Sequence, residues 1–455
     1  MDLHNENQID ENLEVQPLPE LPTEEELREL RRKRRKKAET RATLLAMLLV
    51  FCVFLVIAAG AFGIRYLAGP GVIVTTETED EMQDLVDNML ASEETLPTEV
   101  IDVVTPEEKL DEYIDTMIAG MTLEEKVAGL IITSPEQLTG VDTATRAGDS
   151  TKAAIEAMPV GGLVYYRKNM QSKDQFTEML GNTKSYSTHP IFLAVNEGGD
   201  STSSVQNSPI SVPSVKKPGD VGTEAEAYET GSAIGAYLKE LNFNVNFAPT
   251  ADILWESNAA VKGYCFGGDA SLNSMLVTQY VKGLEEQGLS ATLKTFPGTG
   301  HLKTSTEEGT VGTEKTREDF AQDFMVFKAG IDAGADFVMV SHIVASNLSG
   351  GMEPCSMSST VVTDILRDEL GFEGIIITEP MNVKAITEYY ETSEAVVEAL
   401  KAGCDMILLP QDLKAAHKAI VDGVNDGSIA EARINDSLKR VFRVKYADKL
   451  AEFAE

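Results

Sequence analysis

The chain is short of positive charge. Its 455 residues include 39 lysines and arginines against 73 aspartates and glutamates, which gives a formal net charge of -34. A protein that grips nucleic-acid phosphates needs a basic face, so this balance argues against a nucleic-acid partner. Basic residues are concentrated in one block between Arg28 and Arg41, whose centre at 31–37 reads RRKRRKK.

Cysteine is scarce as well. The four cysteines, Cys52, Cys265, Cys355 and Cys404, are widely separated in the chain. No pair has the spacing of zinc ligands, and a disulfide framework would need more of them. The first predicted strand is not followed by a glycine-rich dinucleotide or phosphate-binding loop. We therefore expect neither a metal ion nor a cofactor.

One long apolar run is present. Ala42–Ile64 is uncharged and 23 residues long, and about 20 apolar residues suffice for a helix to cross a bilayer. A cleaved signal peptide would have a shorter apolar core nearer the N-terminus. Because a basic flank stays in the cytoplasm, the sequence predicts a single-pass protein of the cell membrane, anchored in the lipid bilayer, with a cytoplasmic N-terminus.

Composition divides the chain into four parts. Residues 1–41 form a cytoplasmic tail, acidic and then basic, and residues 42–64 form the transmembrane helix. Residues 65–104 are acidic with few apolar side chains, which is typical of an extended stalk. From residue 105 to 455 short apolar segments alternate with amphipathic ones, which indicates one extracellular α/β domain.

This last part contains eight predicted strands, with helices between them. A doubly wound open sheet is the alternative, but eight strands alternating with helices favour a (β/α)8 TIM-type barrel. The predicted helices include 224–240, 272–287, 317–333, 359–370 and 393–402. The predicted strands are Val127–Ile132, Gly162–Tyr165, Ile191–Val195, Val245–Phe247, Ala291–Leu293, Phe337–Val340, Ile375–Thr378 and Met406–Leu409.

Polar residues follow these strands, at positions that form the active face of such a barrel. Glu379 directly follows the apolar run GIIIT, so we expect its carboxylate at the barrel mouth. Cleavage of a glycosidic bond requires two carboxylates across a cleft. Taken singly, each residue is also compatible with a solvated strand end. The positions are Asn196, Glu197, Asp252, Lys294, Ser341, His342, Glu379 and Gln411.

Four segments, in this order, resemble the N-terminal barrel of glycoside hydrolase family 3. The branch they resemble contains the bacterial β-N-acetylhexosaminidases that act on peptidoglycan amino sugars. The resemblance extends from about Thr105 to Leu450 and implies a carbohydrate partner, a cell-wall amino-sugar glycan. The segments are Met121–Ile131 (MTLEEKVAGLI), Asn246–Pro249 (NFAP), Lys294–Gly300 (KTFPGTG) and Gly371–Thr378 (GFEGIIIT).

The positions that carry the chemistry in this family are substituted. The family pattern KHFPGHG, followed by an Asp-Ser-His triplet that supplies the acid/base, has threonines for both histidines here. The nucleophile, normally the first residue of an Asp-Asp pair, is a glutamate, and the sugar-binding Asp and two Arg positions also differ. The corresponding residues are Thr295, Thr299, Ser305-Thr306-Glu307, Glu379-Pro380, Val195, Asp200 and Tyr264.

Two functions are compatible with this resemblance. The first is a retaining β-N-acetylhexosaminidase-like glycosidase, with Glu379 as nucleophile and Glu307 or Glu308 as the acid. In that enzyme the substrate-binding residues would be Lys294, Glu197, His342 and Asp252. The second is a catalytically inactive family member that binds a glycan or a protein partner at the cell envelope. Several joint changes favour the second, because moving a carboxylate by one methylene costs orders of magnitude in rate.

The predicted topology has a direct test. A protease added to intact cells is expected to digest the chain after Ile64 and to spare the basic block at 31–37, which the bilayer shields. Mass spectrometry of the recovered peptides measures this, with detergent-permeabilised cells as the control. Protection of residues 105–455 in intact cells would contradict the extracellular assignment.

Overall fold

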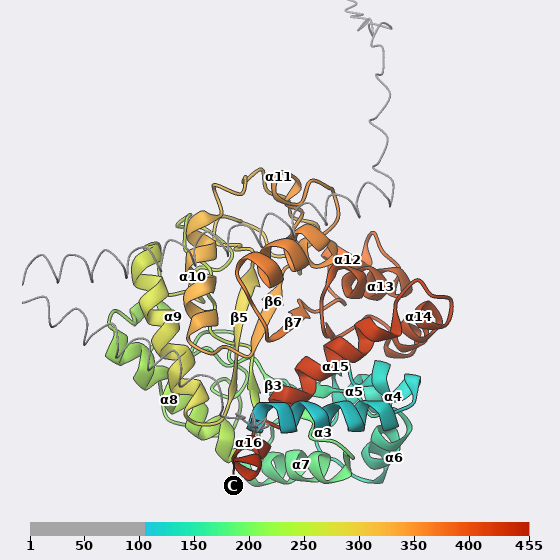
Figure 1. Ribbon diagram of the computed structural model, residues 1–455. Helices are drawn as coiled ribbons and strands as arrows, with labels where there is room; N and C mark the ends of the chain where they lie inside the picture. The colour runs from blue at the N-terminus through green and yellow to red at the C-terminus, as the bar shows by residue number, and fades with distance from the viewer. Residues whose placement is uncertain (1–104, 455) are drawn as a thin grey trace, which may run out of the picture. The chain divides into compact units, whose positions relative to one another are not determined.

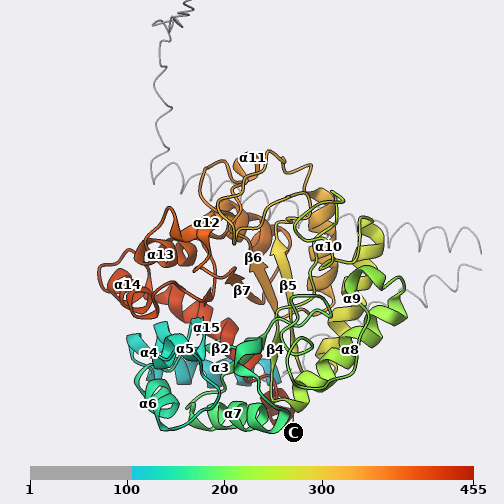
Figure 2. The same cartoon turned by 180° about the vertical axis from the view of Figure 1, so that it is seen from behind.

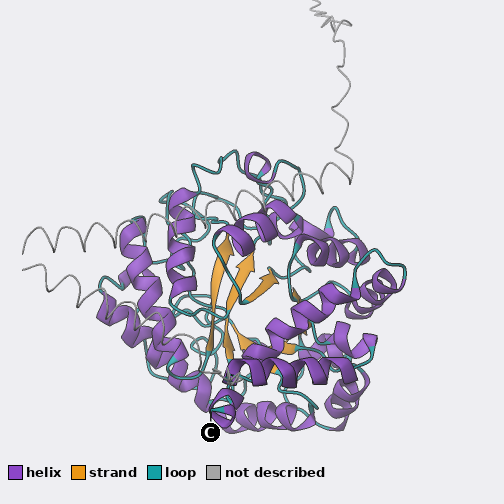
Figure 3. Ribbon diagram, in the orientation of Figure 1, coloured by secondary structure: helices purple, strands orange, loops and turns teal. Residues whose placement is uncertain are grey.

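The structure is a computed structural model in which residues 105–454 are described. The predicted tail, transmembrane helix and stalk at 1–41, 42–64 and 65–104 lie outside the described residues. Residues 105–454 form a sheet of parallel strands enclosed by helices (Figures 1 and 3). Among the helices of this range, none is both long enough and apolar enough to cross a membrane.

The sheet has eight strands in the order β7-β6-β5-β4-β3-β2-β1-β8, and every pair is parallel. A bridge between Ile377 and Met406 joins β7 to β8. The strands therefore run round into a barrel, and the predicted TIM-type fold is confirmed. The strands are β1 (Ile131–Thr133), β2 (Gly162–Val164), β3 (Phe192–Val195), β4 (Val245–Asn246), β5 (Ser290–Phe296), β6 (Phe337–Val340), β7 (Ile375–Thr378) and β8 (Ile407–Leu408).

Helices cover the outside of the barrel (Figure 2). The longer ones are α3 (Pro106–Gly120), α6 (Asp149–Ala157), α7 (Lys173–Tyr186), α8 (Glu224–Glu240), α9 (Ala270–Glu285), α10 (Ala321–Asp332), η4 (Thr360–Glu369), α13 (Thr392–Ala402), α14 (Leu413–Asn425) and α15 (Glu431–Lys445). The shorter ones are α4 (Leu123–Ala128), α5 (Pro135–Thr139), η1 (Arg167–Asn169), η2 (Pro218–Asp220), α11 (Ser346–Ser349), η3 (Cys355–Met357), α12 (Lys384–Thr387) and α16 (Lys449–Phe453).

The first predicted strand was placed too early. Val127 and Ala128 complete helix α4, and β1 begins only at Ile131. The cause is a capping box, in which the Thr122 side chain accepts from the Glu125 N–H and the Glu125 side chain accepts from the Thr122 N–H. This reciprocal pair starts a helix that includes the first apolar residues of the run.

The strand before the glycine-rich segment is longer than predicted. β5 continues from Ala291–Leu293 through Lys294 to Phe296, with a register shift against β6 between Leu293 and Phe296. Such an irregularity redirects side chains at the end of a strand. Lys294 therefore lies within the strand, near its end, rather than in the loop after it.

Helices α8 and α9 pack unusually closely. A Cβ atom on Gly231 would lie 2.3 Å from the Tyr280 carbonyl oxygen, and one on Gly283 would lie 2.5 Å from that of Tyr228. Any side chain at either glycine would force the two backbones apart. Inside the barrel, the Phe192 and Phe337 rings meet edge to face with centroids 5.2 Å apart.

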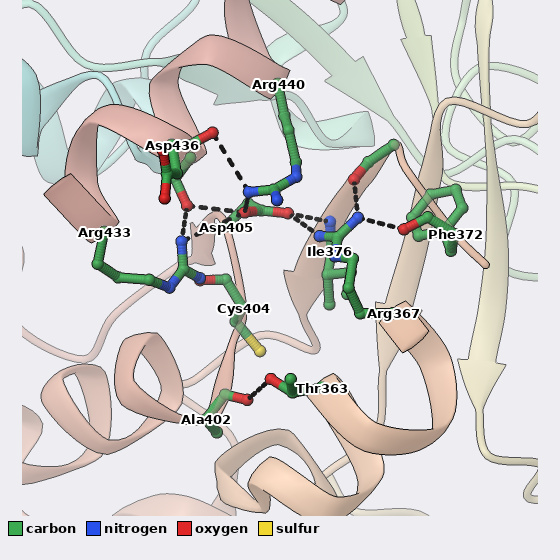
Figure 4. A network of polar contacts seen from close by, with 12 residues as sticks. Thr363, Arg367, Phe372, Ile376, Ala402, Cys404, Asp405, Arg433, Asp436 and Arg440 are labelled. Carbon is green, nitrogen blue, oxygen red and sulfur yellow. Dashed lines mark hydrogen bonds and ion pairs between the residues drawn. The ribbon is translucent and has the colours of Figure 1, made fainter. Parts of the chain in front are cut away.

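A buried aspartate joins several elements at the amino-terminal end of the barrel (Figure 4). Asp405 has no exposed surface and precedes β8. Its carboxylate accepts from Arg367 at 2.5 Å, from Arg440 at 3.2 Å and from the Ile376 N–H at 3.0 Å. Arg433 adds an ion pair at 3.5 Å. This network, the Asp405 network, links η4, β7, β8 and α15 at the face that stabilises barrels.

Removal of Asp405 is expected to destabilise the protein strongly. Asp405→Ala leaves three arginines without their shared carboxylate, and breaking a buried ion pair costs about 3–5 kcal/mol. Urea unfolding of the full-length chain measures the loss. The control is Asp332→Ala, which removes an exposed pair with Lys328 and should cost less than about 0.5 kcal/mol. Equal losses in the two variants would contradict the structural role of the network.

Candidate active site

Glu379 lies directly after β7, at the carboxyl end of the barrel. Its N–H donates to the Val340 carbonyl at 2.9 Å. Its carboxylate accepts from the Ser341 hydroxyl at 3.0 Å, the His342 N–H at 2.8 Å and the Thr306 hydroxyl at 3.3 Å. The carboxylate is therefore held by donors from the two residues after β6 and from the loop that follows β5.

Burial raises the pKa of Glu379 above its ordinary value, because water no longer solvates the charge. The hydrogen bonds from His342, Ser341 and Thr306, and the charge of Lys294, act in the opposite direction. Glu379 itself stays half-buried. The site thus holds the carboxylate in place while the residue as a whole keeps part of its surface exposed.

His342 contacts Glu379 through both its backbone N–H and its ring. Its side chain is fully buried. Nε2 lies 3.1 Å from the Glu379 carbonyl and Nδ1 lies 2.7 Å from the Ser356 hydroxyl. Since a carbonyl only accepts, Nε2 carries the proton and Nδ1 accepts from Ser356. Burial lowers the pKa of His342 to about 4. The structure places this predicted substrate-binding residue as a neutral support with both ring nitrogens occupied.

Lys294 is the cation of the site. Its Nζ donates to the Asn196 side-chain oxygen at 2.6 Å. Burial lowers the pKa of Lys294, and the charges of the neighbouring carboxylates raise it again. The carboxylates whose charges favour the protonated lysine in this way are those of Asp200, Asp252, Glu379 and Glu307.

Asp252, predicted to bind substrate, fastens the glycine-rich loop instead. Its side chain is 1% exposed and accepts from the Thr295 N–H at 3.0 Å, from both threonine hydroxyls at 3.0–3.2 Å, and from the Thr299 N–H. Gly300 allows this close approach, because a Cβ there would lie 1.6 Å from the Ile253 carbonyl oxygen. Thr295 and Thr299 thus serve to fix the loop.

Glu197, also predicted to bind substrate, is buried and turned away from the barrel mouth. Its carboxylate accepts from the Val205 N–H at 2.6 Å, the Tyr237 hydroxyl at 3.0 Å and the Gln206 N–H at 3.4 Å. Burial raises the pKa of Glu197 to about 7, although these donors oppose the shift. The residue anchors the loop between β3 and α8.

Glu307 and Glu308, the predicted acids, lie on the surface of the loop after β5. Both residues are exposed, and no described residue donates a hydrogen bond to either carboxylate. The negative charge of Glu307 raises the pKa of both Lys294 and Tyr166.

One contact and one residue of the site were not predicted. Thr306 reaches Glu379 from a loop, and no sequence pattern indicates that contact. Tyr166 is the second residue after β2, so the rule applied to the other strands would have found it. Burial, aided by the charge of Glu307, raises the pKa of Tyr166. Within residues 105–454 no group of three or more His, Cys, Asp or Glu side chains is arranged to hold a metal ion.

The burial of Glu197 has a measurable pH dependence. A pKa near 7 in the folded state, against about 4.5 unfolded, means that the folded state binds more protons between these values. The free energy of unfolding should therefore fall as pH rises from about 4.5 to 7, by about 2–3 kcal/mol from this residue. Urea unfolding at several pH values should give a flatter profile for Glu197→Gln than for wild type.

The control for this prediction is Glu178→Gln, at an exposed position on α7. It should keep the wild-type slope. An unchanged slope in Glu197→Gln would show that Glu197 is ionised in the folded state at pH 5–7.

Comparison with known proteins agrees with this architecture. The Glycosyl hydrolase family 3 N terminal domain matches residues 122–444. A Beta-N-acetylglucosaminidase/beta-glucosidase of Cellulomonas fimi is 26% identical over 349 residues, which are 73% of this chain and 59% of that protein. A Beta-hexosaminidase of Stenotrophomonas maltophilia (strain R551-3) is 28% identical over 270 residues, 58% of this chain and 78% of that one.

Among solved structures, a glycoside hydrolase family 3 beta-N-acetylglucosaminidase from Paenibacillus sp. str. FPU-7 is similar. It superimposes with a TM-score of 0.67 at 28% identity, over 73% of this chain and 63% of that one. The matched barrel is thus only part of the longer relatives. Since the family match covers well over half of the sequence, the resemblance predicted from the motifs is confirmed, and the chain belongs to glycoside hydrolase family 3 through that family's N-terminal domain.

Proposed function

We propose that this protein is a retaining glycosidase of the β-N-acetylhexosaminidase type, which removes terminal amino sugars from peptidoglycan-type glycans. The observation that carries the proposal is Glu379, a carboxylate held by three donors at the end of β7. The names of the relatives from Cellulomonas fimi, Stenotrophomonas maltophilia and Paenibacillus support the choice of amino sugar.

In the proposed reaction Glu379 attacks the anomeric carbon while Glu307 protonates the leaving oxygen. Water then hydrolyses the glycosyl–enzyme bond with Glu307 acting as base. The donors around Glu379 orient its carboxylate, and the remaining open side receives the sugar. Lys294 holds sugar hydroxyls and stabilises negative charge beside them. A retaining pair needs its carboxyl groups about 5–5.5 Å apart, so Glu307 must approach Glu379 when a glycan binds.

The proposed location is the outer face of the cell membrane. It rests on the apolar run at 42–64 and the basic block before it, with the acidic stalk at 65–104 spacing the barrel from the bilayer. An anchored barrel of this kind would act on glycan close to the membrane, and the bilayer would be a partner of the protein.

A second candidate function is a glycan-binding module without turnover. The specific observation in its favour is the exposure of Glu307 and Glu308. A general acid near neutral pH needs an environment that keeps its proton, usually an apolar one. In addition, the Thr306 hydroxyl lies within hydrogen-bond distance of both oxygens of the Glu379 carboxylate. It must move away from one of these oxygens before that oxygen can attack a sugar.

One substitution separates the two candidates. Glu379→Gln keeps the size of the side chain and removes the attacking charge, so release of aryl alcohol from an aryl β-N-acetylglucosaminide should fall by about 10³-fold or more. Thermal unfolding should show no loss of stability, because the amide is neutral and the buried charge is gone. Binding of N-acetylglucosamine oligosaccharides is measured alongside.

The matched control is Glu373→Gln, an exposed residue at the other end of β7, which should cleave like wild type. If wild type does not cleave, and wild type and Glu379→Gln bind glycan equally, the catalytic proposal fails and the binding module remains. Loss of cleavage in Glu379→Gln alone supports the enzyme.

A further inference from the structure

The amino-terminal end of the barrel, opposite to the candidate active site, contains a small cavity. Its volume is about 50 Å³. Three of the residues that line it, Gly129, Val160 and Pro190, each lie two positions before a strand, namely β1, β2 and β3. Phe442 and Lys445 of α15 also line it. The cavity therefore lies between α15 and the starts of three strands, and takes no part in the function proposed above.

Lys445 is a lysine without a counter-charge. Within residues 105–454 no carboxylate forms an ion pair with its Nζ and no oxygen accepts a hydrogen bond from it. Nζ lies instead over two aromatic rings, 4.8 Å from the centre of Phe192 and 5.9 Å from that of Phe442. Burial lowers the pKa of Lys445 to about 7, because a lysine loses its proton more easily where water does not solvate the charge. A large share of the side chain is thus a neutral amine near pH 7, which is the nucleophilic form.

A histidine lines the same cavity. His189 is half-buried, and its Nδ1 lies 3.0 Å from the Tyr446 hydroxyl. When Nδ1 donates to that oxygen, the lone pair of Nε2 is free, and no residue in the described part of the chain bonds to Nε2. Burial and the positive charge of Lys445 lower the pKa of His189. The imidazole is therefore mostly neutral near pH 7 and is able to accept a proton.

The rest of the lining contains two hydroxyls and one acid. Ser187 and Thr188 line the cavity, and neither hydroxyl has a partner among residues 105–454. Glu125 is the one acidic residue among the described residues of the lining. It is exposed, and its carboxylate already accepts from a backbone N–H at 2.8 Å in the capping box of α4. Its charge raises the pKa of His189 but is not a cause of the shift at the lysine. Donors for a small anionic group are thus available in the cavity that contains the amine.

The size of the cavity and the charge of the chain restrict what reaches the amine. One water molecule occupies about 10–15 Å³ of such a cavity, so a volume of about 50 Å³ admits a group of three or four heavy atoms and excludes a sugar. The net charge of -34 opposes the approach of an anion from solution. Carbon dioxide has three heavy atoms, carries no charge and reacts with neutral amines.

We propose that Lys445 is a carbamylation site, at which carbon dioxide is bound covalently by the side-chain amine with His189 as the proton acceptor. The Nζ lone pair attacks the carbon of CO2, so that a C–N bond forms and one C=O electron pair moves onto oxygen. A proton passes from Nζ to Nε2 of His189, which leaves a carbamate and an imidazolium and does not change the total charge. The carbamate accepts from the hydroxyls of Ser187 and Thr188.

The product supplies the counter-charge that this part of the barrel lacks. A carbamate on α15 paired with the imidazolium of His189, which lies before β3, joins the helix to the start of that strand. Figure 1 shows α15 beside α3, and Arg443 already joins these two helices through Asp111 at 2.6 Å. The amino-terminal end of the barrel thereby gains a contact that depends on CO2. This inference is independent of the reaction proposed at the other end of the barrel.

The test traps the carbamate on the wild-type, full-length chain. The protein is incubated near pH 7.5 with ¹³C-bicarbonate, which supplies CO2, and is then alkylated with triethyloxonium, which converts a carbamate into a stable ethyl ester. Peptide mass spectrometry gives the labelled fraction of each lysine. Lys445 should carry at least about tenfold more label than Lys439 of the same helix, which forms an ion pair with Asp115 at 2.8 Å, because an ammonium has no lone pair for the attack. The α-amino group, with an ordinary pKa of about 7.7–8.0, is the positive control for labelling.

Two variants test the roles of the two residues. Lys445→Arg keeps a positive charge over the aromatic rings but has no nucleophilic amine, so the ¹³C NMR signal of the lysine carbamate should disappear. His189→Asn keeps an N–H for the Tyr446 hydroxyl and loses the proton acceptor. It should lower the labelled fraction at Lys445 about fivefold, the effect of losing one ion-pair partner. The matched control is His417→Asn, at a histidine that does not line the cavity, which should label like wild type.

The wild-type measurement decides the proposal even if a variant does not fold. Label at Lys445 no higher than at Lys439 would overturn the carbamylation site, and so would a carbamate signal that persists at full intensity in Lys445→Arg. Equal labelling of Lys445 in wild type and His189→Asn would overturn the role of His189. Strong label at Lys445 that falls in His189→Asn and not in His417→Asn supports both.

Discussion

The structure depends on buried and half-buried carboxylates at or near the ends of parallel strands, which are held by backbone N–H groups of other segments. Glu197 accepts from Val205, Asp252 from Thr295, Glu379 from His342 and Asp405 from Ile376. A buried charge without partners is very costly. Each of these bonds therefore fixes one segment relative to another, and together they determine where the loops of the barrel lie.

The order of strands and helices follows from the sequence because periodicity and strand length are local properties. Where a local signal of another kind intervened, the prediction failed, as at Val127, where the capping box of Thr122 and Glu125 extends a helix. The kind of residue after each strand was also predictable. Glu379 directly follows β7, in agreement with the strand-end rule, whereas Lys294 lies within β5.

The direction in which a strand-end side chain points was not predictable. Glu197, Asp252 and His342 follow their strands as expected, yet each is turned into the protein and satisfied there. Their partners, such as Val205 and Ser356, are loop residues whose position depends on the tertiary structure. Periodicity contains no information about such contacts. The sequence therefore locates the face of the site but does not separate residues that bind ligand from residues that support them.

The Asp405 network lies at the end of the barrel away from Glu379, and this separation has an evolutionary consequence. Residues at the carboxyl end, including Thr295, Thr299 and Glu379, take no part in the contacts that join η4, β7, β8 and α15. A fold whose stability comes from contacts at one end tolerates substitutions at the other. The barrel is thus a scaffold whose carboxyl end can change its binding preferences without loss of the fold.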